Sequence, residues 1–431
     1  MASNGRLRRF GKYLAKLGKK NFGVDKNCCL KTPHVFRGNG QLRTGTYTTF
    51  RFAQESVRAF VPHALPPATP ALLVADRLAE VHSEALAAIS RLELAGTMVP
   101  SHEWFLYGFV RKEALVSSQI EGTQATLEDV VVYEATQVSA RPADAEEVCN
   151  YVDALLYARD QLARPEGLPI CVRLLCEAHR RLMTGVRGKE KQPGTVRTSQ
   201  NWIGGSRPGT ARFVPPPPES VSGLLSDLEH WIHSHDALPP LIKAGLAHVQ
   251  FETIHPFLDG NGRLGRLLIT LLLIQWQLAS QPLLYLSLEF KRRQQEYYQR
   301  LDAVRTAGDW EGWTLFFLEC VRDSADDGVR SARSLFKLIG RDRNILLHHP
   351  ATTLRAVQLH ELLPQHPVVT LASVMKLLGA SQPTAGRAID ALCNCGVLQE
   401  ITGRKRDRVF SYRSYLNVLA EQIDLPENSE N

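Results

Sequence analysis

The segment that most restricts the fold of this chain is HVQFETIHPFLDGNGRLGRLLITLLLIQW at residues 248–276. Apolar residues recur at helical spacing up to Ile254, the chain breaks at Pro256, and a second strongly apolar run begins near Gly262. Because two helices this apolar must both be buried, the short turn between them is held against a helical core. The polar and glycine residues crowded into that turn are too many for a plain connection, and we expect them to form a site.

Most of the chain from residue 71 to about residue 335 also has apolar residues at three- and four-residue spacing, which is typical of amphipathic helices. The chain has 431 residues, of which 44% are hydrophobic, enough for two or three packed domains. We therefore predict a mainly α fold. The helix patterns cover residues 72–92, 104–120, 126–136, 144–163, 168–184, 218–235 and 238–254.

Three segments depart from the helical pattern. Residues 1–70 are rich in glycine, threonine and proline, which predicts an irregular arm before the first helix. Two short β-capable runs flank a glycine-rich stretch at residues 194–214, which predicts a β-hairpin. Residues 370–416 have the pattern of a winged helix-turn-helix, with Ser381 or Thr384 opening the second helix and a basic turn at 403–408 between two strands.

Charge and cysteine content narrow the class of protein. The formal net charge is +7, but residues 1–43 hold eleven basic side chains and one acid, so the rest of the chain is slightly acidic. We interpret residues 1–43 as a disordered basic extension rather than an organellar transit peptide. Eight cysteines without disulfide or zinc-knuckle spacing favour a cytoplasmic protein. Residues 267–288 lack charge but are interrupted by polar residues and Pro282, so we expect no membrane association.

The turn after Pro256 has the residues that an anion site requires. Gly260 and Gly262, on either side of Asn261, let backbone N–H groups approach a ligand, and the following helix start adds unpaired N–H groups and a positive dipole end. Arg263 and Arg266 lie on one face of that helix, where their planar groups can bind further phosphate oxygens. This arrangement predicts a site for a chain of phosphates.

Two titratable residues of the same turn supply the remaining parts of a transfer reaction. His255 titrates near neutral pH and can take a proton from an attacking hydroxyl. Asp259 offers carboxylate oxygens that can bind Mg²⁺ beside phosphates. The residues GNGRLG at 260–265 fit the glycine pattern of dinucleotide sites, but a helix rather than a strand precedes them, and the chain has no P-loop.

The residues HPFLDGNGRLGR, at 255–266, resemble the signature of the Fic family, HPFx(D/E)GNGRxxR, at every specified position. The resemblance implies a helical core that transfers AMP from ATP to a Ser, Thr or Tyr hydroxyl of a target protein and releases diphosphate. It implies His255 as general base, Asp259 as magnesium ligand, the backbone of residues 260–262 as the hole for the α- and β-phosphates, and Arg263 and Arg266 as clamps on the outer phosphates.

Upstream, SSQIEG at residues 117–122 resembles the inhibitory motif (S/T)xxxE(G/N) of Fic proteins that inhibit themselves, with Ser117, Glu121 and Gly122 matched. The resemblance assigns Arg266 as the partner of Glu121. A carboxylate on this arginine would remove the clamp on the γ-phosphate, so ATP would bind in an unproductive pose.

The same resemblance makes the hairpin at residues 194–214 a flap that holds the target by strand addition, with Ile203, Gly204 and Gly205 at its edge. Tyr298 is the candidate that stacks on adenine. The implied parts are then an N-terminal region with an inhibitory helix at 44–143, a Fic core at 144–335 and a winged helix at 345–420.

Several alternatives stay open. The basic residues of the winged helix, which are Lys376, Arg387, Arg404, Lys405, Arg406 and Arg408, suit phosphate contacts, so the chain could be a DNA-binding regulator whose core senses nucleotide. Winged helices also serve in protein docking, and a homodimer is possible. The fold could also use another phosphate-containing donor, or remove AMP with a water molecule that Glu121 activates.

Overall fold

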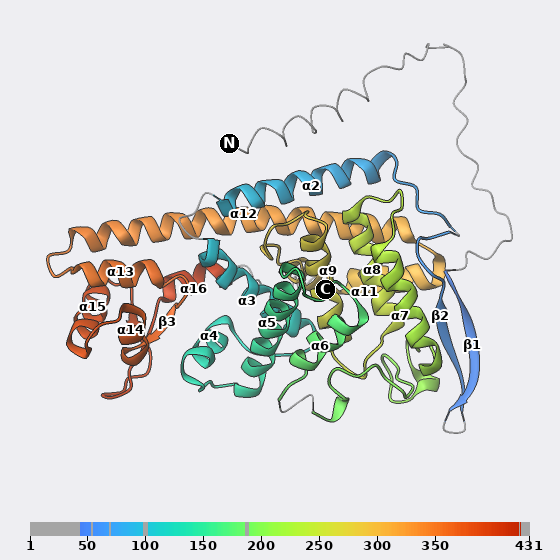
Figure 1. Cartoon of the computed structure of the whole chain (residues 1–431), viewed down its shortest axis with the longest axis horizontal. Coiled ribbons are helices and arrows are strands. Elements are labelled where there is room, and N and C mark those ends of the chain that lie inside the picture. The colour runs from blue at the N-terminus through green and yellow to red at the C-terminus, as the bar shows by residue number, and fades with distance from the viewer. Residues whose placement is uncertain are drawn as a thin grey trace, which may run out of the picture. The chain divides into compact units, whose positions relative to one another are not determined.

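The computed structural model describes residues 44–52, 55–68, 70–97, 102–185, 189–421 and 423, which all belong to one compact unit. The predicted basic extension at 1–43 lies outside the described residues. The fold is mainly α, as predicted (Figure 1). Its helices before the C-terminal part are α2 (Asp76–Thr97), α3 (His102–Ile120), α4 (Leu127–Thr136), α5 (Pro142–Ala163), α6 (Val172–Leu182), α7 (Pro218–His233), α8 (Pro240–Ile254), α9 (Asn261–Gln275), α10 (Ser287–Arg292), α11 (Gln294–Ala307) and α12 (Trp310–His348).

Helices α8 and α9 form the centre of the core. Nearly every side chain of both helices is buried, in agreement with their apolar sequences. Phe317 of α12 lies directly against Gly245 of α8, and Trp313 donates its indole N–H to the carbonyl of Gly245 at 2.9 Å. The turn between the two helices is therefore anchored on both sides by buried structure, as the sequence indicated.

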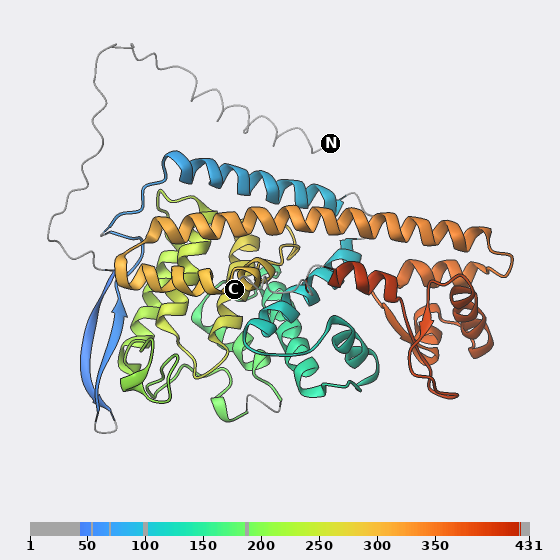
Figure 2. The same cartoon turned by 180° about the vertical axis from the view of Figure 1, so that it is seen from behind.

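The longest helix, α12, has 39 residues and runs beside α2 in the same direction, as both views show (Figures 1 and 2). Successive ion pairs link the two helices, namely Arg77 with Glu319, Glu84 with Arg322, and Arg91 with Asp326. Beyond the end of α2, α12 continues to the C-terminal part, where Asp342 accepts a 2.8 Å hydrogen bond from Tyr412. One helix thus crosses the boundary that we predicted between the core and the winged helix.

The prediction of an irregular arm over residues 1–70 is wrong for its second half. Strands β1 (Gly45–Phe52) and β2 (Glu55–Pro62) pair in antiparallel register from Gly45 opposite Pro62 to Phe52 opposite Glu55. Val57, Ala59 and Phe60 of β2 are buried, while most of β1 is exposed. The alternation of threonine and aromatic residues in β1 is a strand signal that the glycine-rich composition concealed.

The hairpin predicted at residues 194–214 is present only in reduced form. A single antiparallel bridge joins Ile203 to Phe213, and a short 3-10 helix, Pro208–Thr210, takes the place of the expected turn. Backbone groups of this loop bind the first hairpin instead, since Phe60 donates to the carbonyl of Val214 at 3.0 Å. The expected pair of strands is therefore absent from this fully described segment.

The C-terminal part has the element order that the sequence predicted. Two helices meet at a short turn, and the second one begins directly after Ser381. Strands β3, β5 and β4 form a small antiparallel sheet in that order, with the basic turn at 403–408 between β4 and β5. These elements are α13 (Leu354–Leu362), β3 (Val368–Thr370), α14 (Leu371–Leu378), α15 (Gln382–Asn394), β4 (Gln399–Glu400), β5 (Val409–Ser411) and α16 (Arg413–Ala420).

Candidate active site

The turn between α8 and α9 is closed by its own side chains and backbone. Asn261 donates to the carbonyl of Phe257 at 2.8 Å and accepts from the N–H of Phe257 at 2.9 Å. The Asn261 side chain thus shapes the loop through two hydrogen bonds to the backbone of Phe257. Gly260 has a φ of +75°, and a Cβ there would lie 2.8 Å from the sulfur of Met183, so no other residue fits this position without strain.

The first residues of α9 have backbone N–H groups that find no carbonyl partner within the helix. At this helix start, the carboxylate of Glu121 lies so close to Gly262 that a Cβ there would collide with Oε1. An acidic group thus already stands at the positive end of the helix, where a negative charge is favoured. The anion cradle at this helix start stays a prediction.

His255 follows the last residue of α8 and has a φ of +50°, a left-handed conformation that is rare for residues other than glycine. Its Nδ1 lies 3.3 Å from the carbonyl oxygen of Glu252. With Nδ1–H donating to that oxygen, Nε2 keeps its lone pair. Burial lowers the pKa of His255 to about 4, and the ring is therefore neutral near pH 7.

Asp259 lies at the outer side of the turn, with 47% of its side chain exposed. Its Oδ1 accepts from the N–H of Gly260 at 2.6 Å and lies 3.8 Å from Nη2 of Arg263. The carboxylate borders a polar cavity of about 210 Å³ that Glu121 and Arg263 also line. This is smaller than the roughly 300–1,000 Å³ of ordinary ligand pockets.

Both arginines of the turn are already paired with glutamates. Arg266, whose side chain is 2% exposed, donates from Nη2 to Oε1 of Glu121 at 2.7 Å. It also donates from Nε to the hydroxyl of Ser117 and from Nη2 to the carbonyl of Ser117, each at 2.9 Å. Arg263 donates from Nη1 to Oε1 of Glu147 at 2.7 Å.

The pKa of Glu121 reflects this pairing. Burial acts to raise the pKa of this carboxyl, but the Arg266 guanidinium outweighs burial and holds the net value below the usual range. The pKa of Arg266 is raised, because the attraction of Glu121 outweighs the cost of burial. Glu121 is therefore ionised and bound to Arg266 at neutral pH. Gly122 follows with a φ of +99°, which lets the chain turn away directly after the carboxylate.

The other predicted site residues lie at two places. Tyr298 on α11 is 37% exposed and packs against Tyr297 at 5.3 Å between ring centroids. It lines a hollow of about 470 Å³ with Gln294, Gln295, Gln299 and Arg212, of which Arg212 belongs to the predicted flap segment. Ile203 is 36% exposed at the single bridge of that segment, and the predicted edge residues Gly204 and Gly205 follow it, both exposed.

Sequence reasoning missed several residues that contact the turn, and three of them make short polar contacts with it. Glu147 on α5 binds Arg263 and also accepts from Oγ1 of Thr123, the residue after Gly122, at 3.0 Å. His179 on α6 lies 3.0 Å from the carbonyl of Asp259. Arg197 donates to the carbonyl of His255 at 2.8 Å. Each is 58 or more residues away from its partner in the turn, so no local spacing could reveal it.

Two family profiles match the chain. The Fic/DOC family N-terminal profile matches residues 79–160, which include the Ser117 to Gly122 motif. The Fic/DOC family profile matches residues 169–273, which include the whole turn between α8 and α9.

The chain is also similar to named proteins. It is 32% identical over 163 residues to the protein adenylyltransferase Fic of Drosophila grimshawi, a match that covers 37% of this chain and 30% of that protein. It is 32% identical over 179 residues to the protein of the same name from Aedes aegypti, covering 41% of this chain and 31% of that protein. The chain thus spans about 30% of the length of these relatives.

A solved structure shares the fold. The crystal structure of a Fic family protein from Desulfovibrio desulfuricans G20 superposes with a TM-score of 0.52 at 22% identity, covering 79% of this chain and 97% of that chain. In the described part of the present chain, no helix is both long and apolar enough to cross a bilayer.

Proposed function

We propose that this chain, in which Fic/DOC family profiles match residues 79–160 and 169–273, is a protein adenylyltransferase, which transfers AMP from ATP to a Ser, Thr or Tyr hydroxyl of a target protein. The observation that carries the proposal is one turn that joins a neutral histidine, an exposed carboxylate, a helix start and two arginines. The relatives named protein adenylyltransferase support the same reaction.

In the reaction that we propose, His255 is the general base. Nε2 accepts the proton of the target hydroxyl while the hydroxyl oxygen attacks the α-phosphorus of ATP. The bond between that phosphorus and the oxygen bridging to the β-phosphate breaks, and diphosphate leaves. The low pKa of His255 supports this role, because a histidine that was already protonated could not accept the proton.

The phosphates would lie at the start of α9. Backbone N–H groups of residues 260–262 would bind the α- and β-phosphates, and Arg263 and Arg266 would bind the outer phosphate oxygens. The contact between Glu121 and Gly262 supports this proposal, since a carboxylate stands where we expect the phosphates. Tyr298, beside an open hollow, is the proposed partner of adenine.

Asp259 is the residue that would hold Mg²⁺, and its environment fits this ion. Its carboxylate is half exposed beside the polar cavity, and its ion pair with Arg263 is long at 3.8 Å. In the described ranges no cluster of three histidine, cysteine or acidic side chains could bind a metal alone, so the ion would take its other ligands from phosphates and water. When bound, Mg²⁺ would neutralise phosphate charge and help diphosphate to leave.

We propose that Glu121 inhibits the enzyme by occupying Arg266. A triphosphate has to displace this carboxylate before its γ-phosphate can reach the arginine, and Ser117 binds the same guanidinium at Nε and Nη2. The pair is partly buried, with 37% of Glu121 and 2% of Arg266 exposed, so water screens it only in part. Inhibition would persist until ligand, target or partner moves α3.

Other parts of the proposal concern the target and the setting. An extended segment of the target would add to the backbone edge at Ile203, Gly204 and Gly205, which would bring its hydroxyl to His255.

The six cysteines that the structure describes are unpaired, which supports the cytoplasm as the compartment. The predicted homodimer stays a prediction, which sedimentation equilibrium of the full chain tests.

The test is transfer of label from α-labelled ATP with Mg²⁺ to protein. We expect weak labelling by wild type, labelling at least ~10-fold stronger by Glu121→Gly, and none by His255→Ala. Incubation with cell lysate and mass spectrometry then identifies the modified peptide. Absence of label from Glu121→Gly, with ATP still bound, would contradict the proposal and favour a nucleotide sensor.

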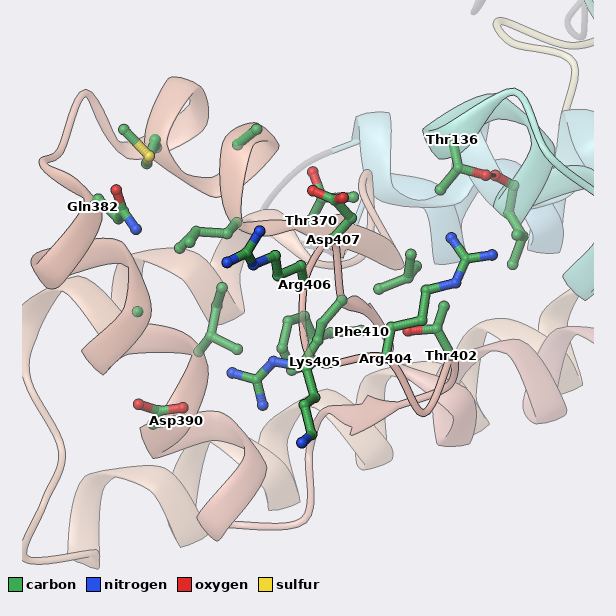
Figure 3. A pocket seen from close by; sticks show the side chains of 18 of the residues that line it. Thr136, Thr370, Gln382, Asp390, Thr402, Arg404, Lys405, Arg406, Asp407 and Phe410 are labelled. Atoms are coloured by element: carbon green, nitrogen blue, oxygen red, sulfur yellow. Dashed lines mark hydrogen bonds between the residues drawn. The ribbon is translucent and has the colours of Figure 1, made fainter.

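A DNA-binding role is the second candidate, because one observation favours it. A groove of about 770 Å³ lies between the turn at 403–408, α14 and α15, and the end of α4 also lines it (Figure 3). Arg404, Lys405 and Arg406 project from that turn, as Figure 3 shows, and none of them forms an ion pair with a described residue. We propose that this part is a winged helix whose groove receives the phosphate backbone of a duplex.

Salt dependence tests the DNA proposal. The full chain should bind duplex DNA with an affinity that falls steeply as salt rises, and the double variant Arg404→Ala/Arg406→Ala should reduce the slope of log affinity against log salt by about 1.8. The double variant Arg333→Ala/Lys337→Ala, which removes the same charge from exposed positions of α12, is the control. Equal slopes for both variants would contradict the proposal.

A further inference from the structure

Arg197 is a buried cation beside the candidate active site, near the start of the predicted flap segment at residues 194–214. It is 1% exposed, and no carboxylate of the described residues forms an ion pair with it. Its side-chain hydrogen bonds to the described residues all go to backbone carbonyls instead. They are Nε to His255 at 2.8 Å, Nη2 to Pro216 at 2.6 Å and to Ile254 at 3.4 Å, and Nη1 to Ser199 at 3.3 Å.

The contacts of Arg197 converge on the residue that we propose as the base. The carbonyls of Ile254 and His255 end α8 and have no partner further along the helix, so a cation at this end is favoured. The backbone N–H of Arg197 also donates to the carbonyl of Pro256 at 2.9 Å. One residue therefore fixes three consecutive peptide groups, 254 to 256.

These peptide groups hold a conformation that the chain does not adopt easily. His255 has a φ of +50° and ψ of +62°, which place a non-glycine residue in the left-handed region. Such a conformation persists only where surrounding contacts determine it, and it decides where the imidazole points. The guanidinium of Arg197 supplies such contacts to the backbone of His255, in addition to the ring's own contact with the carbonyl of Glu252.

We propose that Arg197 is a positioning residue that sets the backbone, and hence the ring direction, of His255. The inference rests on the proposed function, in which His255 is the base. Arg197 does not itself contact phosphates or target. Its guanidinium binds two carbonyls from different segments, those of His255 and Pro216, at once. Because the ammonium of lysine is a point charge, it cannot reproduce both contacts.

Arg197 also acts on His255 through its charge. The charged groups that face His255 are Arg197, Glu121 and Arg305. Burial is the main reason for the low pKa of His255, and the positive charge of Arg197 lowers it further. A variant that keeps the charge and one that removes it therefore separate the geometric role from the electrostatic role.

The experiment uses the full chain with Glu121→Gly, whose labelling by α-labelled ATP establishes the activity first. We expect Arg197→Lys to reduce kcat by about 100-fold, because a misplaced base loses about that much, while the KM for ATP changes less than threefold. Arg197→Gln should reduce kcat as much and move the acid limb of the pH profile to higher pH, since the positive charge is lost. Arg197→Lys should leave the position of that limb unchanged.

Lys243→Gln is the matched control. Lys243 is a buried cation on α8 that donates to the carbonyls of Trp231 at 3.3 Å and Ser234 at 3.0 Å, at the end of α7, and it also pairs with Asp236 at 3.3 Å. Its loss should lower the thermal midpoint, as loss of Arg197 does, but leave kcat and the pH profile unchanged. If folded Arg197→Lys keeps full kcat, or if Lys243→Gln loses as much kcat as Arg197→Lys, the inference is overturned. If Glu121→Gly alone does not label, the proposed function fails instead.

Discussion

Oε1 of Glu121 lies 2.7 Å from Nη2 of Arg266, on a guanidinium that is almost completely buried. The two residues are 145 positions apart in the chain, so the contact ties the end of α3 to the second turn of α9. The same carboxylate touches Gly262, at the helix start where a phosphate would bind. In this account the phosphates of ATP and the carboxylate of Glu121 therefore compete for the same site.

Ser117→Ala should release inhibition only in part. The hydroxyl of Ser117 accepts one charged hydrogen bond from Arg266, while the carbonyl of the same residue keeps a second one. The loss of one such bond costs about 1.5–3 kcal/mol, and the glutamate contact remains. We expect self-labelling above wild type but below Glu121→Gly, measured with α-labelled ATP. Labelling equal to that of Glu121→Gly would show that Ser117, not Glu121, holds the inhibited state.

Glu147→Gln should destabilise the free protein and strengthen the response to ATP. Its carboxylate binds Arg263 in a pair with side chains only 13% and 7% exposed. Removing one partner of such a buried pair costs up to about 3–5 kcal/mol, because Arg263 then stays buried with only its long 3.8 Å ion pair to Asp259. Thermal unfolding should show a lower midpoint without ATP and a larger increase on adding ATP with Mg²⁺ than wild type shows. An unchanged midpoint would mean that the pair contributes little.

Activity of Glu121→Gly should persist well below pH 6.5. Burial depresses the pKa of His255 to about 4, so the ring stays neutral and able to accept a proton until the pH approaches that value. The acid limb of kcat/KM should therefore lie between pH 4 and 5.5, with circular dichroism checking that the protein stays folded. A limb near pH 6.5 would mean that the ring is solvated as an ordinary histidine.

Acidification to about pH 5 should not activate the wild-type protein. The pKa of Glu121 is held below its usual value, so the carboxylate stays ionised, and its stabilising contact with Arg266 is lost only as the pH falls through that lowered pKa. The ratio of labelling at pH 5 to labelling at pH 7 should be the same for wild type as for Glu121→Gly. Selective activation of wild type at pH 5 would contradict the claim that the ion pair of Glu121 with Arg266 persists at that pH.

Asp259→Asn should remove labelling while keeping ATP binding. The amide cannot replace a carboxylate as the only protein ligand that we assign to Mg²⁺, so we expect labelling by Glu121→Gly to fall at least ~100-fold. Chelation of Mg²⁺ should reduce labelling by Glu121→Gly to the same extent. It should not reduce labelling by the double variant Glu121→Gly/Asp259→Asn any further. Binding of ATP by calorimetry is the control that the site still forms.

Much of the central fold could be predicted from local signals. The end of α8 at Ile254 agrees with the predicted limit, and α9 begins at Asn261, one residue before the predicted start. These helix ends could be predicted because the apolar periodicity stops where Pro256 breaks the chain. The strand pair at residues 45–62 was missed because glycine and threonine were interpreted as loop signals.

Other features could not be predicted from spacing. Residues 194–214 form hydrogen bonds to β2, which is more than 130 residues away in the chain. The local hairpin pattern could not reveal these bonds, and it predicted more pairing within the segment than the single bridge that the structure has. The pair of Glu121 with Arg266 was expected only through the family resemblance. The partners Glu147 and Arg197 reach the turn from other elements, and only the packed structure brings them there.

The most direct test of the account compares two labels in Glu121→Gly with Mg²⁺ present. ATP labelled at the α-phosphate should label the protein, ATP labelled at the γ-phosphate should not, and His255→Ala in the same background should abolish the signal. Label from the γ-phosphate, or none from either, would contradict AMP transfer by this turn.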